Sequence, residues 1–219
     1  MVSNLSQILF FLEVLLFGSV IFMHLSKKSS TVVSLYAAQS FIVVILLLNS
    51  FFKNPSALLA ITIAVIFAVK VIVAPKFFFG LVKRHQLKFS ASTYLNDTLT
   101  LVALAILTAL TYSHYFSPLA VLAPQNEKAV LLAVAMMLVS IFLLINRKGV
   151  LSQMIGILSL ENAIVSFAFL AGLEETPGLQ LGIIFDILVW VIIATVFASM
   201  IYKQFGTLDV SAMKNLKEE

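Results

Sequence analysis

Seven apolar runs, each long enough to cross a lipid bilayer, constrain this sequence more than any other feature. A spanning helix needs about 20 apolar residues. The runs cover roughly residues 5–25, 31–52, 56–82, 97–116, 127–145, 149–171 and 178–202. The runs VVILLLNSFF and LLAVAMMLVSIFLLI lack the alternation of a membrane β-strand. With 61% hydrophobic and 11% charged residues, the sequence predicts an all-α integral membrane protein of about seven transmembrane helices.

The basic residues predict how these helices are oriented. Ten of the fourteen follow the first, third, fifth or seventh run: Lys27, Lys28, Lys83, Arg84, Lys88, Arg147, Lys148, Lys203, Lys214 and Lys217. Because positive loops stay in the cytoplasm, we expect an outside N-terminus and a cytoplasmic C-terminus in a bacterial or archaeal cytoplasmic (inner) membrane. The basic charge then reports orientation, and we expect no nucleic-acid partner.

Short loops predict one membrane domain over residues 1–219, with parts that follow the runs. We expect an N-terminal three-helix part with a cytoplasmic loop (1–96), a fourth helix and outer loop (97–126), a second three-helix unit (127–202) and a cytoplasmic tail (203–219). Asn96 or Asp97 is expected to cap the fourth helix. Runs one to three and five to seven share a pattern that places Gln39 where the second unit has Glu161. Duplication and topology alone both explain this pattern.

Four ionisable residues lie deep within the runs: Glu13, Lys70, Glu161 and Asp186. At 1.5 Å per residue they lie about 18–24 Å from the cytoplasmic ends of their helices, provided that the third helix continues past Pro75. A central charge costs roughly 2.5–3.5 kcal/mol to insert, so such residues are rare and mostly functional. The pattern predicts a proton or ion relay near the bilayer midplane, with Asn162 orienting Glu161 or a water. The alternative is a buried pair that only fixes helix packing.

Several kinds of chemistry have no residues to support them. The chain has no cysteine, so it has no thiolate ligands for a metal or an iron–sulfur cluster. Its three histidines fall at different depths, which argues against a bis-histidine haem. No basic region precedes the first run and no cleavage site follows it, so we expect a retained span and not a signal peptide. We expect no cofactor in this chain and no catalytic residue.

Four motifs resemble a known family. They are VKVIVAP around Lys70, GILSLENA around Glu161, LGIIFDILVWVII around Asp186 and FGTLDVSAMKNLKE in the tail. In this order they resemble component E of hydrogenase-4-type membrane complexes, over most of positions 60–217. Residues 127–202 are also similar to the K subunit of respiratory complex I, whose second and third helices carry glutamates. Glu161 lies about one turn later than that glutamate, and Asp186 is a shorter acid.

The resemblance implies a membrane-arm subunit of a proton- or Na⁺-translocating, complex I-like group 4 [NiFe] hydrogenase or formate hydrogenlyase. Its partners would be antiporter-like membrane subunits and a hydrogenase module, which would carry the [NiFe] centre and iron–sulfur clusters. The expected ion pathway is Lys70, Glu161 and Asp186, with Glu13, Asn162 and Gln39 as additional members. Two alternatives stay open: a subunit of a cation/proton antiporter or ion-uptake complex without a redox partner, and a structural membrane spacer.

Overall fold

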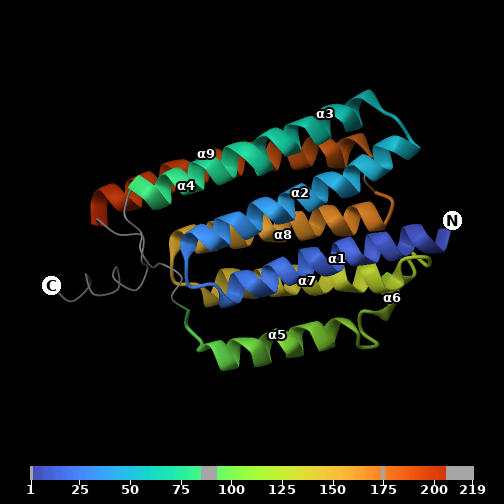
Figure 1. Ribbon diagram of the computed structural model, residues 1–219, viewed down its shortest axis with the longest axis horizontal. Coiled ribbons are helices and arrows are strands. Elements are labelled where there is room, and N and C mark those ends of the chain that lie inside the picture. Colours follow the sequence, from blue (N-terminus) through green and yellow to red (C-terminus); the bar gives the residue numbers. More distant parts are fainter. Residues whose placement is uncertain (1, 85–92, 174–175, 206–219) are drawn as a thin grey trace.

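The computed structural model describes residues 2–84, 93–173 and 176–205, and nearly all of them are helical. The helices are α1 (Val2–Leu25), α2 (Ser29–Lys53), α3 (Ala57–Ile66), the π-helix η1 (Phe67–Val73), α4 (Ala74–Arg84), α5 (Asp97–Thr111), α6 (Ser117–Ala120), α7 (Glu127–Asn146), α8 (Val150–Leu170) and α9 (Pro177–Phe205) (Figure 1). Every predicted run therefore contains a helix, which confirms the all-α prediction.

Among the residues that the structure describes, five helical stretches are long and apolar enough to cross a membrane, counting α3, η1 and α4 as one continuous stretch. They are Gln7–Leu25, Ser29–Lys53, Ala57–Lys83, Glu127–Asn146 and Val150–Leu170. The predicted run 97–116 ends early, because α5 stops at Thr111 after 15 residues. The polar stretch TYSHYFSP follows, and the chain turns there before the short α6, which has Pro118 in its first turn. At about 1.5 Å per residue, α5 is shorter than the hydrocarbon core of a bilayer.

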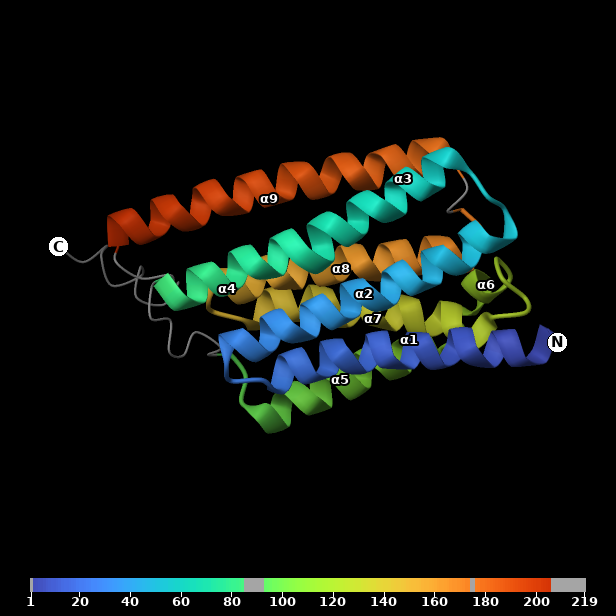
Figure 2. The ribbon, with the colours of Figure 1, turned by 45° about the horizontal axis from the view of Figure 1, so that its top comes forward.

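The helices form two layers of three. One layer holds α1, α2 and the continuous rod of α3, η1 and α4, while the other holds α7, α8 and α9. Helix α1 packs against α7, α2 against α8 and α3 against α9, and the members of each pair run in the same direction (Figures 1 and 2). Helix α5 lies outside both layers, against α7 and α1. Corresponding helices of the predicted repeat therefore face each other, which places α2 and its Gln39 against α8 and its Glu161.

Helix α8 is the most enclosed of the five candidate spans. A Cβ atom added to Gly156 would lie 3.3 Å from the backbone nitrogen of Leu144, so this glycine lets α8 approach α7 closely. The outer surfaces, by contrast, expose large apolar side chains such as Phe22, Ile106 and Ile145. An apolar exterior is the surface that a lipid environment favours.

Most basic residues gather at one end of the molecule, which we call the basic end. Here α1, α4, α7 and α9 end, and α2, α5 and α8 begin (Figure 2). The described basic residues at this end are Lys27, Lys28, Lys83, Arg84, Arg147, Lys148 and Lys203. Lys53 and Lys128 lie at the opposite end, at the end of α2 and the start of α7. The up-and-down path of the chain thus brings the basic segments together as the sequence predicts.

Candidate functional site

Lys70 occupies the middle of the third candidate span and points into the protein. It belongs to η1, where it is the buried residue, with 1% of its surface exposed. Pro75 follows two residues after η1; a proline inside a helix has no N–H to donate and clashes with the carbonyl four residues earlier. A wider π turn just before it accommodates both defects. The helix does continue past Pro75, as the predicted depth of Lys70 required.

Glu161 forms an ion pair with Lys70. The distance from Lys70 Nζ to Glu161 Oε1 is 3.2 Å, and the two side chains are 1% and 8% exposed. Glu161 is the twelfth of the 21 residues of α8, so both charges lie near the middle of their helices. The sequence predicted both residues at this depth, and the fold brings them into contact.

Polar side chains extend this pair into what we call the central network. Lys70 Nζ donates to Asn162 Oδ1 at 3.0 Å, and Asn162 Nδ2 donates to Gln39 Oε1 and Ser40 Oγ, both at 3.1 Å. Gln39 Nε2 donates to Ser159 Oγ, which in turn pairs with Ser140 Oγ, again at 3.1 Å. The network joins α2, η1, α7 and α8. Asn162 binds the lysine directly, whereas the sequence suggested that it orients Glu161 or a water.

Three serines of this network were not predicted: Ser40, Ser140 and Ser159. Serine in an apolar helix commonly bonds to the carbonyl one turn earlier, as Ser34 does here. One signal was available on α8. Ser159, Asn162 and Ser166 are separated by three and four residues, so they share one face of the helix. That face turns toward α2, α7 and α1.

Glu13 is buried but lies outside the central network. It is fully buried in α1, and Ser166 donates a hydrogen bond to its Oε1. Its Oε2 has no hydrogen-bond partner among the described residues, which also give it no ion pair. Ser166 lies one turn beyond Asn162 on α8, so Glu13 is adjacent to the network without bonding to it. The carboxyl group therefore faces the interior of the chain.

Asp186 is the third predicted residue of the ion pathway, and the structure does not describe the contacts of its side chain. It lies in α9, which packs against α3 and α8. Its side chain lies outside what the structure describes, as do residues 206–219 of the predicted tail. The contribution of Asp186 to the ion pathway remains a prediction.

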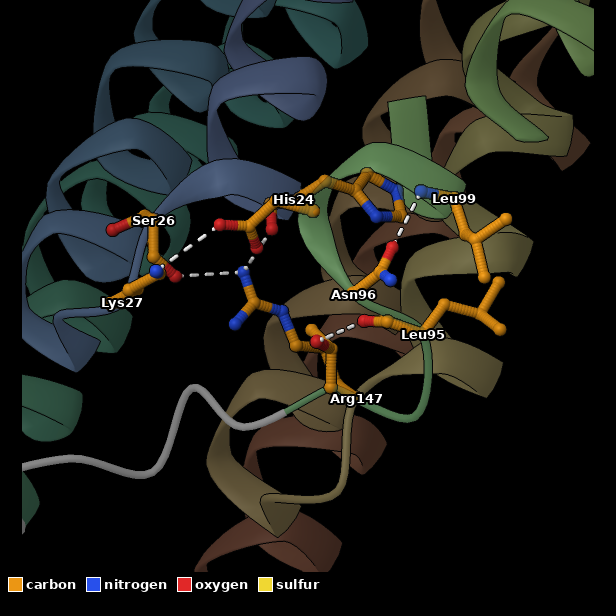
Figure 3. A network of polar contacts seen from close by, with 9 residues as sticks. His24, Ser26, Lys27, Leu95, Asn96, Leu99 and Arg147 are labelled. Atoms are coloured by element: carbon orange, nitrogen blue, oxygen red, sulfur yellow. Dashed lines mark hydrogen bonds and ion pairs between the residues drawn. The ribbon is translucent and has the colours of Figure 1, made fainter. Parts of the chain in front are cut away.

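A second buried polar cluster lies at the basic end, around Arg147. Only 1% of this residue is exposed, and its Nη2 donates to the carbonyl oxygens of Met23, His24 and Ser26, the last two at 2.9 Å (Figure 3). These are carbonyls at the end of α1, which have no partner within the helix. Burial lowers the pKa of Arg147 to about 10, so the guanidinium stays protonated at neutral pH. From the sequence we interpreted Arg147 only as a signal of helix orientation, and its role as a buried cap at the end of α1 was not predicted.

Neighbouring contacts fix the start of α5 in the same cluster. Asn96 Oδ1 accepts a hydrogen bond from the Leu99 backbone N–H at 2.8 Å, which confirms the predicted cap (Figure 3). Asn146 Oδ1 accepts from the Leu95 N–H at 3.0 Å, and Asn146 Nδ2 donates to Thr100 Oγ1 at 3.1 Å. Lys27 forms an exposed ion pair with Asp97 at 3.1 Å. This cluster ties the loop before α5 to the end of α7.

The central network suits charge and proton transfer better than metal binding. No three His, Cys, Asp or Glu residues come together within the described part of the chain. Two surface pockets of about 400 and 380 Å³ lie at the end opposite the basic end, and no residue of the network lines either one. What the network does contain is an ion pair joined to amide and hydroxyl groups, which can hold a proton or respond to a nearby charge.

Comparisons with known proteins provide a relative but no function. No family model matches this sequence, and no solved structure matches it. The chain is 29% identical over 173 residues to the uncharacterized protein Rv0085 of Mycobacterium tuberculosis (strain ATCC 25618 / H37Rv). The match covers 78% of each of the two chains. The chain is thus similar to this mycobacterial protein over most of its length.

Proposed function

We propose that this chain is a membrane-arm subunit of a proton- or Na⁺-translocating, complex I-like hydrogenase complex. The observation that carries the proposal is the Lys70–Glu161 ion pair, buried at mid-helix and bonded to Asn162. Intramembrane charges of this kind mark ion pathways more often than they mark packing alone. The four motifs that resemble hydrogenase-4 component E point to the same function.

The proposed topology has seven spans in a cytoplasmic (inner) membrane. The five long apolar helices account for five of them, α5 together with the turn and α6 that follow it would add the fourth, and α9 would add the seventh. Placing the basic end in the cytoplasm satisfies the positive-inside rule, with the N-terminus outside. In this arrangement Lys70 and Glu161 lie near the middle of the bilayer.

The ion pair can convert a change of charge into a change of protonation. Two unit charges 3.2 Å apart attract each other by about 5 kcal/mol at an effective dielectric constant of about 20. A proton that binds Glu161 removes this attraction, while Asn162 still holds the Lys70 ammonium group in place. A charge that arrives beside Lys70 has the converse effect, because it changes how strongly Glu161 holds its proton. Proton movement and neighbouring charge are therefore coupled through this pair.

Redox chemistry would belong to partner subunits in this proposal. The chain has no cysteine to ligate an iron–sulfur cluster or a [NiFe] centre. Antiporter-like membrane subunits and a hydrogenase module would be the partners, with the metal centres in that module. The residues of this chain would hold and pass charge between those subunits, with Asp186, Glu13 and Gln39 as further members of the pathway.

The direct test is Glu161→Gln in the intact complex. Sealed membrane vesicles are assayed for ion translocation, electron transfer and subunit content, with pH and Na⁺ indicators used in parallel. Glutamine keeps the shape but cannot carry a proton, so we expect translocation per assembled complex to fall by on the order of a hundredfold. Ser34→Ala, in an exposed helical serine bonded to its own helix, is the matched control. Normal translocation by Glu161→Gln would remove Glu161 from the pathway.

A second candidate function is a structural spacer, and a specific observation favours it. The central network bonds four helix segments together, so the buried pair also fixes their packing. Glu161→Gln would then reduce subunit content and leave translocation per assembled complex unchanged. The antiporter alternative is separated by purification, because it predicts that no metal-containing subunit copurifies with this chain.

A further inference from the structure

The buried hydroxyl groups of α2 and α8 that lack a hydrogen-bond partner in the described part of the chain are distributed unevenly about the Lys70–Glu161 pair. On the side toward the basic end, three buried hydroxyl groups have no hydrogen bond among the described residues: those of Ser29, Tyr36 and Ser152. On the other side, the buried Ser166 hydroxyl of α8 is bonded to Glu13, and the buried positions of α2 and α8 include Val43, Leu47, Val165 and Phe169. Within the described ranges, the one atom of these two helices that lacks a hydrogen bond there is an amide oxygen, Asn49 Oδ1. A buried polar group without a protein partner is most simply satisfied by water.

These hydroxyl groups lie on faces that meet. Ser29, Val33, Tyr36 and Ser40 follow one another on α2 at intervals of four, three and four residues, which is one face of a helix. Ser152, Ile155 and Ser159 share one face of α8 in the same way. All seven residues are buried, and α2 packs against α8. Both helices begin at the basic end, so Ser29 and Ser152 lie in their first turns.

Tyr36 lies deepest of the three and closest to the ion pair. Its ring packs edge-on against Phe78 of α4, with ring centroids 6.4 Å apart. Its hydroxyl lies beside the Ser40 side chain and within electrostatic range of Glu161, yet forms no hydrogen bond of normal geometry. Ser40 accepts a hydrogen bond from Asn162, so the tyrosine adjoins the central network on the side of the basic end.

We propose that water and protons reach the Lys70–Glu161 pair from the basic end, between α2 and α8, with Tyr36 as the last hydroxyl before Glu161. In the transfer step the Tyr36 hydroxyl gives its proton to the Glu161 carboxylate and takes one from a hydronium ion on its other side. The products are a neutral carboxylic acid, an unchanged tyrosine and a water molecule, so charge and protons balance. This proposal rests on the proposed function for its purpose, because only an ion pathway requires protons to reach the pair. Whether water reaches the interface can be tested separately.

The absence of native cysteine makes the route directly testable by labelling. Val33→Cys and Ser152→Cys are introduced singly into the full chain in its native membranes, with Ile155→Cys as a second deep probe on the facing helix. Vesicles of both orientations are treated with a small, membrane-impermeant methanethiosulfonate cation. Val20→Cys and Ser19→Cys, both buried in α1, which is neither of the two helices that line the route, are the matched controls.

We expect the probes to react from the basic-end side on the order of tenfold faster than the controls, because a thiol must meet water to ionise. Val33→Cys and Ile155→Cys are the decisive probes, because Ser152 lies in the first turn of α8, close to the end of the molecule. If Val33→Cys and Ile155→Cys react no faster than Val20→Cys, or only from the opposite side, the route is wrong. Labelling does not require translocation, so labelled probes combined with normal pumping by Glu161→Gln would contradict the proposed function alone.

Tyr36→Phe tests the last step of the route. Phenylalanine keeps the packing against Phe78 but has no proton to transfer, so we expect translocation to slow on the order of tenfold with unchanged labelling of Val33→Cys. Tyr112→Phe is the control for this substitution, because Tyr112 is half exposed and far along the chain from the network. An unchanged rate in Tyr36→Phe would remove this residue from the route.

Discussion

Lys70 and Arg147 are equally buried, with 1% of each residue exposed, but their surroundings differ in kind. Lys70 lies at mid-helix beside a carboxylate, whereas Arg147 lies at a helix end and donates to three backbone carbonyls. Carbonyls cannot change their charge, so these three contacts of Arg147 serve the fold. The Lys70–Glu161 pair has a partner that can gain and lose a proton. Burial of a charge therefore does not identify a functional site until its partner is known.

The largest effect that sharpens this comparison is expected from Arg147→Ala. The substitution leaves three carbonyls at the end of α1 without their donor, and each buried polar group left unpaired costs about 1–3 kcal/mol. We expect a loss of about 4 kcal/mol or more in the free energy of unfolding, and much less chain in the membrane. Thermal unfolding in detergent measures this loss, with the partly exposed Lys148→Ala as control. A normal unfolding temperature would contradict the assignment of Arg147 as a helix cap.

A smaller but more informative effect is expected at Lys70. Lys70→Met leaves the Glu161 carboxylate buried without a cation, and breaking a buried pair costs about 3–5 kcal/mol. Replacing both charges, in Lys70→Met/Glu161→Gln, removes the unpaired charge and should recover most of that stability. The double-mutant cycle is measured by thermal unfolding. If the loss in the double variant equals the sum of the losses in the two single variants, the residues do not interact as the structure places them.

The smallest effect is expected at Glu13. This carboxyl group accepts a hydrogen bond from Ser166 and has no cation beside it within the described part of the chain. Glutamine has the same size and keeps an oxygen that can accept this hydrogen bond. Glu13→Gln should therefore change the unfolding free energy by less than about 1 kcal/mol. A loss as large as that of Lys70→Met would indicate an ionised Glu13 with a cationic partner.

The sequence predicted the helices and the charged centre of the site better than it predicted their connections. Long apolar runs require helices in lipid, and charges inside such runs are rare enough to mark Lys70 and Glu161. The serines that join them carry no such signal, because a serine in an apolar helix can bond to its own backbone. The π-helix around Lys70 and the cap by Arg147 depend on packing between segments far apart in the sequence. A dibasic loop looks the same whether its arginine is buried or exposed.

The predicted boundaries failed where polarity changes gradually. Residues 112–116 were assigned to the fourth span, yet α5 ends at Thr111, because tyrosine, serine and histidine there are compatible with either a helix end or a turn. The pattern shared by the two three-helix units corresponds to helices that pack together. Helices α2 and α8, which hold equivalent places in the two units, contribute Gln39 and Asn162 to one hydrogen bond.

Ion translocation by the charge-free double variant tests the central claim most directly. Lys70→Met/Glu161→Gln should assemble, because it leaves no unpaired charge at mid-helix, so a defect in pumping cannot be attributed to lost packing. The measurement is the initial rate of ion translocation in sealed vesicles, normalised to assembled complex and compared with electron transfer. We predict a normal amount of complex that no longer translocates ions. Wild-type translocation by this variant would show that the buried pair only holds the helices together.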